Sequence, residues 1–392
     1  MVAPSDADRS APSETDVPIE AILHQTAIEA TGLEDFGGPE YLPGLRAMVR
    51  ALETDIGLSG EDLLSAAGPI VRGLIGRLYS QKGWKDNPSA LERPISAPLF
   101  ITGMPRTGTT ALHHLLGWDP GFQGLESWLI PNPMVRPPRS EWEGIEHFRT
   151  AAETARAVTG PKRRAHWVDA HEYNECQGLM LQTMVTNSFG SQRSVPSYDS
   201  WFYAQDQTPG FLRLADQLRL IGASSDKRWL LKNPSHLLSL HALFAAFPDA
   251  RVVVTHRDPV EAIPSLCNLL WIMRSERRGA PDSDPRLIGR RELDNWRRAL
   301  DSYEGVKKQY SPQILDVYQR DLVEDPVNVV NLIYQRFEIE RDGSAQALME
   351  TGAATPTTGQ AAPEYRAEDF GLSDELIRAR YVGYRETYGF AA

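Results

Sequence analysis

A glycine-bounded loop at residues 103–110 has the spacing of a phosphate-binding loop. Gly103 and Gly108 are separated by four residues and are followed by two threonines, which is the frame of the nucleoside-triphosphate motif G-x-x-x-x-G-K-[ST]. Thr109 stands where that motif has the lysine that reaches the β- and γ-phosphates. Backbone N–H groups in such a loop, and at the start of the next helix, still favour a 5′-phosphate. The pattern predicts a nucleotide site without the usual γ-phosphate contact.

An arginine inside the loop changes the anions that it can bind. Arg106 follows Pro105 and offers a permanently charged, planar guanidinium that can donate to two oxygens at once. Such a group suits a nucleotide whose 5′ end bears a phosphate and one further anionic group. The loop therefore favours a modified monophosphate over a triphosphate.

At this loop the chain resembles the sulfotransferases that use 3′-phosphoadenosine-5′-phosphosulfate (PAPS), in which Pro-[Arg/Lys]-[Ser/Thr]-Gly-Thr-Thr binds the 5′-phosphosulfate end. The resemblance implies that the donor is bound by the loop residues Pro105, Arg106, Thr107, Gly108, Thr109 and Thr110. It continues along residues 228–265, where a strand ending in Arg257 is followed eight residues later by Ser265, as in the family's 3′-phosphate site.

The resemblance extends beyond these two sites. Residues 318–326 and 368–372 also look like landmarks of the family, and the similar segments together span most of residues 30–390. They resemble the bacterial branch related to the tyrosylprotein sulfotransferases. Lys232, which ends a buried-looking strand, is expected in that context to face the nucleotide or the sulfuryl group.

Sulfuryl transfer requires an in-line acceptor hydroxyl, neutralisation of charge on the sulfuryl and bridging oxygens, and a base for the hydroxyl proton. It requires no metal and no covalent intermediate. Arg106 is the expected source of positive charge. The nine histidines form no ligand-like cluster, and the string His-Glu-x-x-Glu at residues 171–175 is not a zinc motif, so the sequence predicts no metal site.

The catalytic base is expected in one of two segments. Related enzymes place a glutamate close to Glu126, although an ungapped match puts Ser127 there and a one-residue shift is required. A loop carboxylate could take the proton if partial desolvation raised its pKa. The alternative segment offers His171, Glu172 and Glu175. The two glutamates share a face of an expected helix, where they also suit its N-terminus.

One part of the family pattern is missing. Relatives usually carry a basic, glycine-containing segment that folds over the 3′ side of the nucleotide, but nothing basic lies between Arg341 and Arg366. Either Arg366 or the basic run from Arg274 to Arg298 replaces it, or the donor site is weaker. The main alternative function is therefore a nucleotide-binding protein that keeps the fold without catalysis. A P-loop kinase is the second alternative, disfavoured by the absence of the lysine and of an obvious magnesium carboxylate.

The elements that position these residues alternate from residue 97 onward. Short runs of Val, Ile and Leu predict parallel strands, buried on both faces, at 98–103, 228–232, 251–256 and 314–319. Helices are expected at 108–117, 171–189, 208–222, 235–247, 259–275, 289–308, 326–338 and 373–387. This order predicts an α/β fold, a three-layer P-loop-like domain with a central parallel sheet plus a helical N-terminal region.

The sequence predicts three regions. Residues 1–18 are rich in Pro, Ser, Ala and Asp and are expected to be a disordered tail. Residues 19–95 have helical spacing and are expected to pack on the core, and residues 96–392 form the sulfotransferase-like α/β domain. Residues 276–288 and 341–364 look irregular and are candidate lids or connectors.

Composition limits the partners and the compartment. The 392 residues carry a net charge of −11, which argues against general nucleic-acid binding. Cys176 and Cys267 cannot make a disulfide framework, no apolar stretch is long enough for a membrane span, and the first residues lack a leader pattern. We expect a cytoplasmic enzyme that acts on a small-molecule, lipid or carbohydrate hydroxyl. The sequence leaves the oligomeric state open, a homodimer included.

Overall fold

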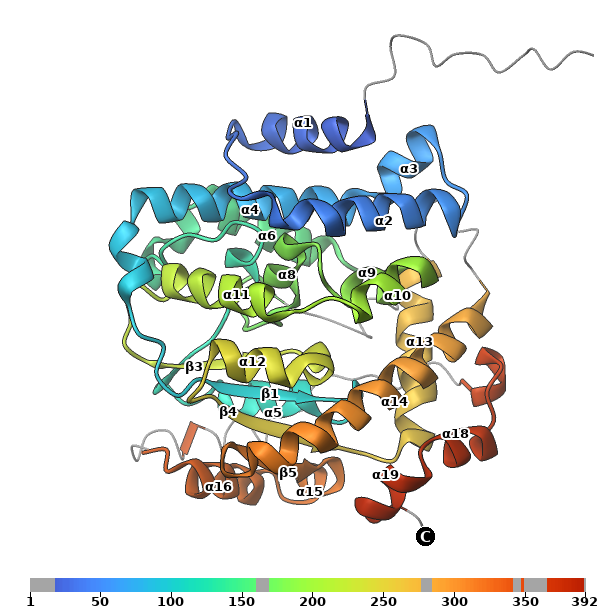
Figure 1. The fold of residues 1–392 in the computed structure, drawn as a ribbon. Coiled ribbons are helices and arrows are strands. Elements are labelled where there is room, and N and C mark those ends of the chain that lie inside the picture. The colour runs from blue at the N-terminus through green and yellow to red at the C-terminus, as the bar shows by residue number, and fades with distance from the viewer. Residues whose placement is uncertain (1–17, 160–168, 276–283, 341–346, 349–364, 391–392) are drawn as a thin grey trace, which may run out of the picture.

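The centre of the protein is a five-stranded parallel sheet with the strand order β2-β3-β1-β4-β5 (Figure 1). The computed structural model describes residues 18–159, 169–275, 284–340, 347–348 and 365–390. The strands are β1 (Leu99–Gly103), β2 (Phe122–Gln123), β3 (Arg228–Lys232), β4 (Arg251–His256) and β5 (Ile314–Tyr318). All four predicted strands are confirmed, and β2 is a short addition at one edge. All the pairings are parallel, so the carboxyl ends of the strands meet at one edge.

Helices cover both faces of the sheet. Alternate residues of a strand point to opposite faces, and in β1 Leu99 and Ile101 join one apolar cluster while Phe100 joins another. The first face packs against α5 (Thr109–Leu116) and α16 (Pro326–Phe337). The second packs against α11 (Thr208–Ile221), α12 (Leu240–Ala246), α13 (Pro259–Ser275) and α14 (Pro285–Gln309). The three-layer α/β architecture is confirmed.

The N-terminal helices build a second apolar core. They are α1 (Ile19–Thr31), α2 (Leu42–Thr54), α3 (Gly60–Ala66) and α4 (Gly68–Asp86), and Figure 1 shows them in blue at the opposite end of the molecule from the red C-terminal helices. Their cluster includes Met184 and Tyr198 from the middle of the chain. The N-terminal helices therefore pack directly on chain segments that also contact the sheet domain.

Two glycines let these helices approach the rest of the chain closely. A Cβ atom on Gly73 of α4 would lie 2.7 Å from the Leu181 carbonyl oxygen, and one on Gly44 of α2 would lie 2.4 Å from the Met184 carbonyl oxygen. Both distances are shorter than an ordinary van der Waals contact, and the opposing atoms belong to the backbone. The contact between α4 and residues 181–184 therefore requires a residue without a side chain.

We expect Gly73→Ala to lower the free energy of unfolding by about 1–3 kcal/mol, the usual cost of overpacking. Alanine normally stabilises a helix interior relative to glycine by about 1 kcal/mol. Gly305 in α14 is a matched control because a Cβ there would meet nothing within 4 Å. Urea denaturation should show Gly305→Ala at or above the wild-type stability and Gly73→Ala below it. Equal stabilisation by both changes would contradict the close packing of α4.

The predicted helix at 171–189 is wrong as a single element. The chain instead forms α8 (Gln177–Met180), a 3-10 helix at Leu181–Thr183 and α9 (Ser188–Gln192), and Met184 between the last two has φ +57°. Before α8 the backbone is used elsewhere, because the Asn174 N–H donates to the Leu125 carbonyl and the Cys176 N–H to the Lys232 carbonyl. These long-range hydrogen bonds replace the first turn of the expected helix.

The remaining elements differ from expectation mainly at their ends. The other α-helices are α6 (Glu146–Ala157), α10 (Pro196–Tyr203), α15 (Gln319–Glu324), α18 (Asp374–Arg380) and α19 (Val382–Thr387). Short 3-10 helices lie at Pro39–Tyr41, Pro88–Glu92, Ser127–Leu129, Arg139–Gly144, Leu181–Thr183, Pro234–Ser239, Ser311–Gln313 and Ala367–Phe370. The predicted helix at 373–387 is divided at Tyr381, and α14 begins within the segment expected to be irregular.

Several sequence predictions fall outside the described residues. They are the tail at residues 1–17, the segment 276–283 and nearly all of 341–364. None of the helices in the described part of the chain combines the length and the apolar character that a membrane crossing needs.

Candidate active site

The glycine-bounded loop connects β1 to α5 at the carboxyl edge of the sheet. Gly103 has φ +144°, and a Cβ atom there would lie 2.5 Å from the Thr255 carbonyl oxygen in β4, so glycine is required. Gly108 has φ +94° immediately before α5. The buried Thr107 hydroxyl lies 2.6 Å from the Met104 carbonyl oxygen and 2.5 Å from the Thr255 hydroxyl. The Thr107 side chain thus holds the loop against β4.

The start of α5 meets a buried lysine. Lys232, at the end of β3, is only 2% exposed, and its Nζ donates to the Thr110 hydroxyl at 3.2 Å and to Glu175 Oε1 at 2.5 Å. A buried ammonium needs such partners because desolvation strongly disfavours an isolated charge. The structure therefore joins Thr110 and Lys232 and adds Glu175 to them. The Thr110 side chain is exposed, whereas the side chain of the preceding Thr109 is buried.

Arg106, Arg257 and Ser265 come together on the other side of the loop. Arg106 has φ +70°, and its Nε donates to the Ser265 hydroxyl at 3.1 Å. The Arg257 guanidinium donates to the Arg106 carbonyl oxygen at 3.1 Å. Partial burial lowers the pKa of Arg106, and the Arg257 charge acts in the same direction. Two neighbouring cations at one loop favour an anionic ligand between them.

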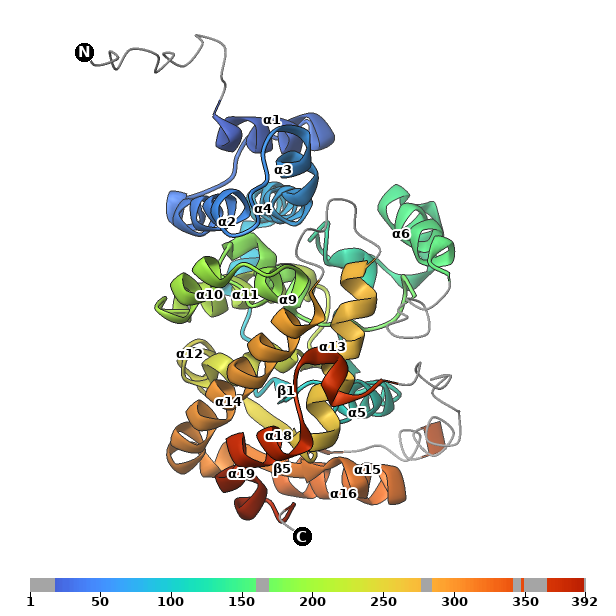
Figure 2. The ribbon, with the colours of Figure 1, turned by 90° about the vertical axis from the view of Figure 1, so that its right-hand side faces the viewer.

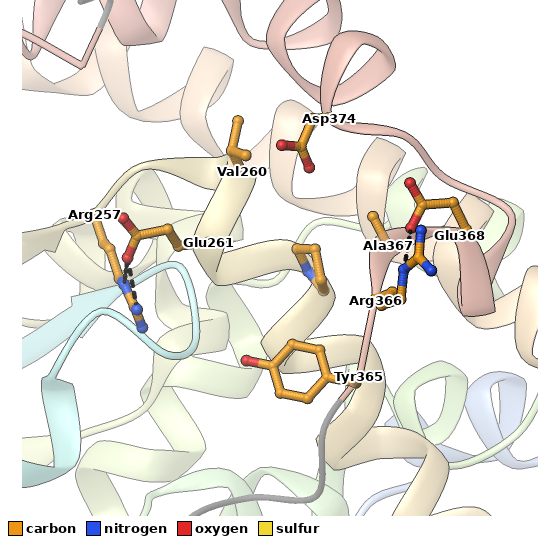
Figure 3. A pocket seen from close by; sticks show the side chains of 9 residues that line it. Arg257, Val260, Glu261, Tyr365, Arg366, Ala367, Glu368 and Asp374 are labelled. Carbon is orange, nitrogen blue, oxygen red and sulfur yellow. Dashed lines mark hydrogen bonds and ion pairs between the residues drawn. The ribbon is translucent and has the colours of Figure 1, made fainter.

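A cavity of about 470 Å³ opens beside Arg257 (Figure 3). Its lining residues are Arg257, Val260, Glu261, Pro264, Tyr365, Arg366, Ala367, Glu368 and Asp374. Arg257 donates twice to Glu261 Oε2, at 2.9 and 2.7 Å, and Arg366 lies 3.4 Å from Glu368. In Figure 3 the Tyr365 ring lies between these two ion pairs. The cavity is thus bordered by two arginines from segments more than 100 residues apart.

These positions bear on the missing basic segment. Arg366 lines the same cavity as Arg257, whereas two arginines of the run 274–298 have structural partners. Arg274 donates to the Gly190 carbonyl oxygen at 2.8 Å, and Arg291 pairs with Asp199 at 2.7 Å. Arg366 therefore lies where a replacement for the basic segment would be needed, and its role as that replacement stays a prediction.

Glu126 is buried, but its carboxylate is already engaged. Arg136 Nε donates to it at 3.0 Å, and the same guanidinium binds the Gln123 side chain at 2.8 Å. Burial raises the pKa of Glu126, and the Arg136 charge opposes that rise. The Glu126 backbone pairs with Tyr173, two residues before Glu175. Glu126 therefore lies near the site, with its carboxylate held by Arg136. Its assignment as the base stays a prediction.

In the second segment predicted to hold the base, Glu175 contacts the buried lysine of the site, whereas His171 does not. His171 is half-exposed, with Nδ1 3.5 Å from Asp169, whereas Glu175 touches Lys232. The sequence pattern did not single out His114, which lies one turn after Thr110 in α5. Burial lowers the pKa of His114, nearby Glu172 raises it and Lys232 lowers it. His114 would have been found from its i, i+4 spacing to Thr110.

Within the described ranges, no group of three or more His, Cys, Asp or Glu side chains is arranged to hold an ion. Positive charge at the site comes from Arg106, Lys232 and Arg257.

The fold and the site together define the class of protein. A parallel sheet, a glycine-bounded loop between its central strand and a helix, and cations at the carboxyl ends of neighbouring strands are typical of P-loop-like nucleotide-binding α/β proteins. The pattern of the sulfotransferase family matches residues 98–343, more than half of the sequence. The chain therefore belongs to the sulfotransferase family.

Curated relatives match part of the chain. The omega-hydroxy-beta-dihydromenaquinone-9 sulfotransferase Stf3 of Mycobacterium bovis, and that of Mycobacterium tuberculosis, is 24% identical over 254 residues, which are 61% of this chain. The chain spans 62% of the length of these relatives.

Two solved structures are similar over nearly the whole chain. Sulfotransferase STF1 from Mycobacterium tuberculosis is 34% identical with a TM-score of 0.83, covering 94% of this chain and 99% of STF1. Sulfotransferase STF9 from Mycobacterium avium is 25% identical with a TM-score of 0.85, covering 95% of this chain and 97% of STF9. The similarity includes the N-terminal helices as well as the sheet domain.

Proposed function

We propose that the protein transfers a sulfuryl group from PAPS to a hydroxyl of a small-molecule, lipid or carbohydrate acceptor. The S–O bond to the 5′-phosphate breaks as a bond from sulfur to the acceptor oxygen forms. The acceptor proton passes to a base, and adenosine 3′,5′-bisphosphate is the second product. The observation that carries this proposal is the contact of Arg257 with Arg106, because it brings a second cation beside the glycine-bounded loop, where a 3′-phosphate could bind.

The two ends of the donor would use different residues. Gly108, Thr109 and Thr110 would bind the 5′-phosphate through loop and helix N–H groups, and Arg106 would neutralise charge on the bridging and sulfuryl oxygens. Arg257 and Ser265 would bind the 3′-phosphate. Because Ser265 accepts a hydrogen bond from Arg106, the two ends are connected in the protein itself.

The acceptor side is the region around Lys232. Its buried ammonium would stabilise charge on the sulfuryl oxygens, and such a group is strongest where water is excluded. Glu175 pairs with that ammonium, so the geometry favours Glu175 as a base beside the sequence candidates Glu126 and His171. The name of the relative Stf3 specifies a hydroxylated dihydromenaquinone, which makes an apolar alcohol a useful first acceptor to test.

The proposed setting is the cytoplasm, where the donor would be available. Cys176 and Cys267 are both free and buried in the structure, which supports a chain that does not depend on disulfides.

Calorimetric titration with adenosine 3′,5′-bisphosphate, AMP and ATP tests the donor assignment. In buffer containing EDTA the bisphosphate should bind more tightly than AMP, because only the bisphosphate engages Arg257. Magnesium-dependent binding of ATP in preference to the bisphosphate would overturn the proposal in favour of a kinase-like site.

We expect Arg257→Ala to weaken bisphosphate binding by about 2–3 kcal/mol, the scale of a charged hydrogen-bonded contact. Binding of AMP, which lacks the 3′-phosphate, should change little. Arg297→Ala is a matched control because Arg297 also forms an i, i+4 ion pair and is 30% exposed, against 28% for Arg257. Equal losses for both nucleotides would show that Arg257 does not recognise the 3′-phosphate.

A further inference from the structure

The C-terminal helices lie against the strand end that carries Arg257. Figure 2 shows α18 and α19 beside α14 and β5, and Arg366 and Asp374 of the same segment line the cavity next to Arg257. One residue of α19 contacts the residue that precedes Arg257 in the sequence, and the next residue of α19 contacts the one that follows Arg257.

The first contact fixes His256, the residue before Arg257. Its ring is fully buried, with Nε2 2.8 Å from Asp316 and Nδ1 2.9 Å from the Tyr384 hydroxyl. The ionised Asp316 carboxylate can only accept a hydrogen bond, so Nε2 carries the proton and donates to it. Nδ1 then accepts a hydrogen bond from the Tyr384 hydroxyl. The ring also stacks on Tyr388, with centroids 4.1 Å apart. His256 is therefore held on two edges and one face, partly by α19.

The second contact fixes Asp258, the residue after Arg257. Arg385 of α19 donates to both carboxylate oxygens of Asp258, through Nε at 3.1 Å and Nη2 at 3.1 Å. The two side chains are only 12% and 20% exposed, so water screens this pair weakly. Asp258 also accepts from the Val260 N–H at 3.0 Å, at the start of α13. Arg385 thus joins α19 to the turn between β4 and α13.

We propose that α19 is a positioning element of the donor site: Tyr384 and Arg385 hold the backbone on both sides of Arg257, so that its guanidinium faces the cavity. This inference rests on the proposed function, because it requires Arg257 to bind the 3′-phosphate. A charged side chain whose backbone is already fixed loses less conformational freedom when it binds an anion. Neither Tyr384 nor Arg385 lines the cavity, so the role proposed for each is to position Arg257 rather than to contact the nucleotide.

The test compares nucleotide affinities of Arg385→Ala with those of the wild type. The Kd for adenosine 3′,5′-bisphosphate should rise by about fivefold to tenfold, while the Kd for AMP changes less than about twofold. Arg385→Lys, which keeps the charge but not the two-oxygen contact, should fall between. Arg380→Ala is the control, because Arg380 pairs with Asp294 on the surface at 2.6 Å. Its affinities should match the wild type.

A double-mutant cycle separates positioning from general destabilisation. In an Arg257→Ala background, Arg385→Ala should cause no further loss of bisphosphate affinity, since its effect acts through Arg257. An equal loss in both backgrounds overturns the inference. If Arg385→Ala does not fold, Tyr384→Phe, which removes only the hydroxyl contact to His256, takes its place in the cycle. A wild type that does not prefer the bisphosphate over AMP contradicts the proposed function. A bisphosphate Kd in Arg385→Ala that stays within about twofold of the wild-type value contradicts only the role of α19.

Discussion

Arg106→Ala should reduce sulfuryl transfer by roughly 10³-fold or more, the scale found when a positioned cation or oxyanion donor is removed. The guanidinium lies in the phosphate loop beside Ser265 and Arg257, where charge would develop on the bridging oxygen. The fold should persist, because the loop is held by the Thr107 side chain and by its glycines. Initial rates and thermal unfolding of the purified variant check both parts.

Arg320→Ala is the control for this experiment. Arg320 is 59% exposed at the start of α15, at the same edge of the sheet, and its removal changes the net charge by the same amount. It should leave the transfer rate within about twofold, since exposed charges are screened by salt. If Arg106→Ala kept a rate near that of Arg320→Ala, the loop arginine would have no catalytic role.

Glu175→Gln should slow transfer by roughly 10²–10⁴-fold, the usual contribution of a general base. The isosteric amide cannot take the acceptor proton, and it leaves Lys232 without a negative partner. Bisphosphate binding should be retained or strengthened, because the site becomes more positive. The measurement is the single-turnover rate at saturating donor, together with the bisphosphate Kd.

Glu126→Gln should destabilise the fold, as Glu175→Gln should, because each carboxylate neutralises a buried cation, but Glu126→Gln should slow transfer less. Its carboxylate balances Arg136 in a pair that is 7% and 12% exposed, and breaking a buried ion pair costs about 3–5 kcal/mol. We expect a clear loss of thermal stability with a smaller effect on the transfer rate of the folded fraction. A stable Glu126→Gln protein without transfer activity, alongside an active Glu175→Gln, would make Glu126 the base, as the sequence resemblance predicts.

The strands and the loop were predictable because their signals are local. Parallel strands buried on both faces appear as short apolar runs, and 251–256 is such a run. The two glycines, Gly103 and Gly108, indicate a loop whose backbone needs positive φ angles, which favour glycine. In the structure a Cβ atom at Gly103 would also clash with β4. Residues at strand ends, such as Lys232 and Arg257, then follow from the rule that ligands bind at the carboxyl edge.

The direction of each side chain at the site was not predictable in this way. Residues 171–175 have the composition of a helix start. No helix begins there, because backbone N–H groups in and just after this segment donate to the carbonyls of Leu125 and Lys232, which are distant in sequence. Nothing local indicates that Glu126 turns toward Arg136. The pairing of Arg385 with Asp258 spans 127 residues and leaves no periodic trace in the sequence. Such contacts are set by tertiary packing, which overrides local preference.

The most direct test of the account follows the sulfur atom. The protein is incubated with PAPS labelled with ³⁵S and with a panel of alcohols, phenols, sterols, sugars and a hydroxylated menaquinone, in the presence of EDTA. The account predicts that label moves to at least one hydroxyl acceptor, with one adenosine 3′,5′-bisphosphate released for each sulfate transferred and none with Arg106→Ala. Label that stays on PAPS with every acceptor, in a protein that binds the bisphosphate, would contradict it and indicate a nucleotide-binding protein without transfer activity.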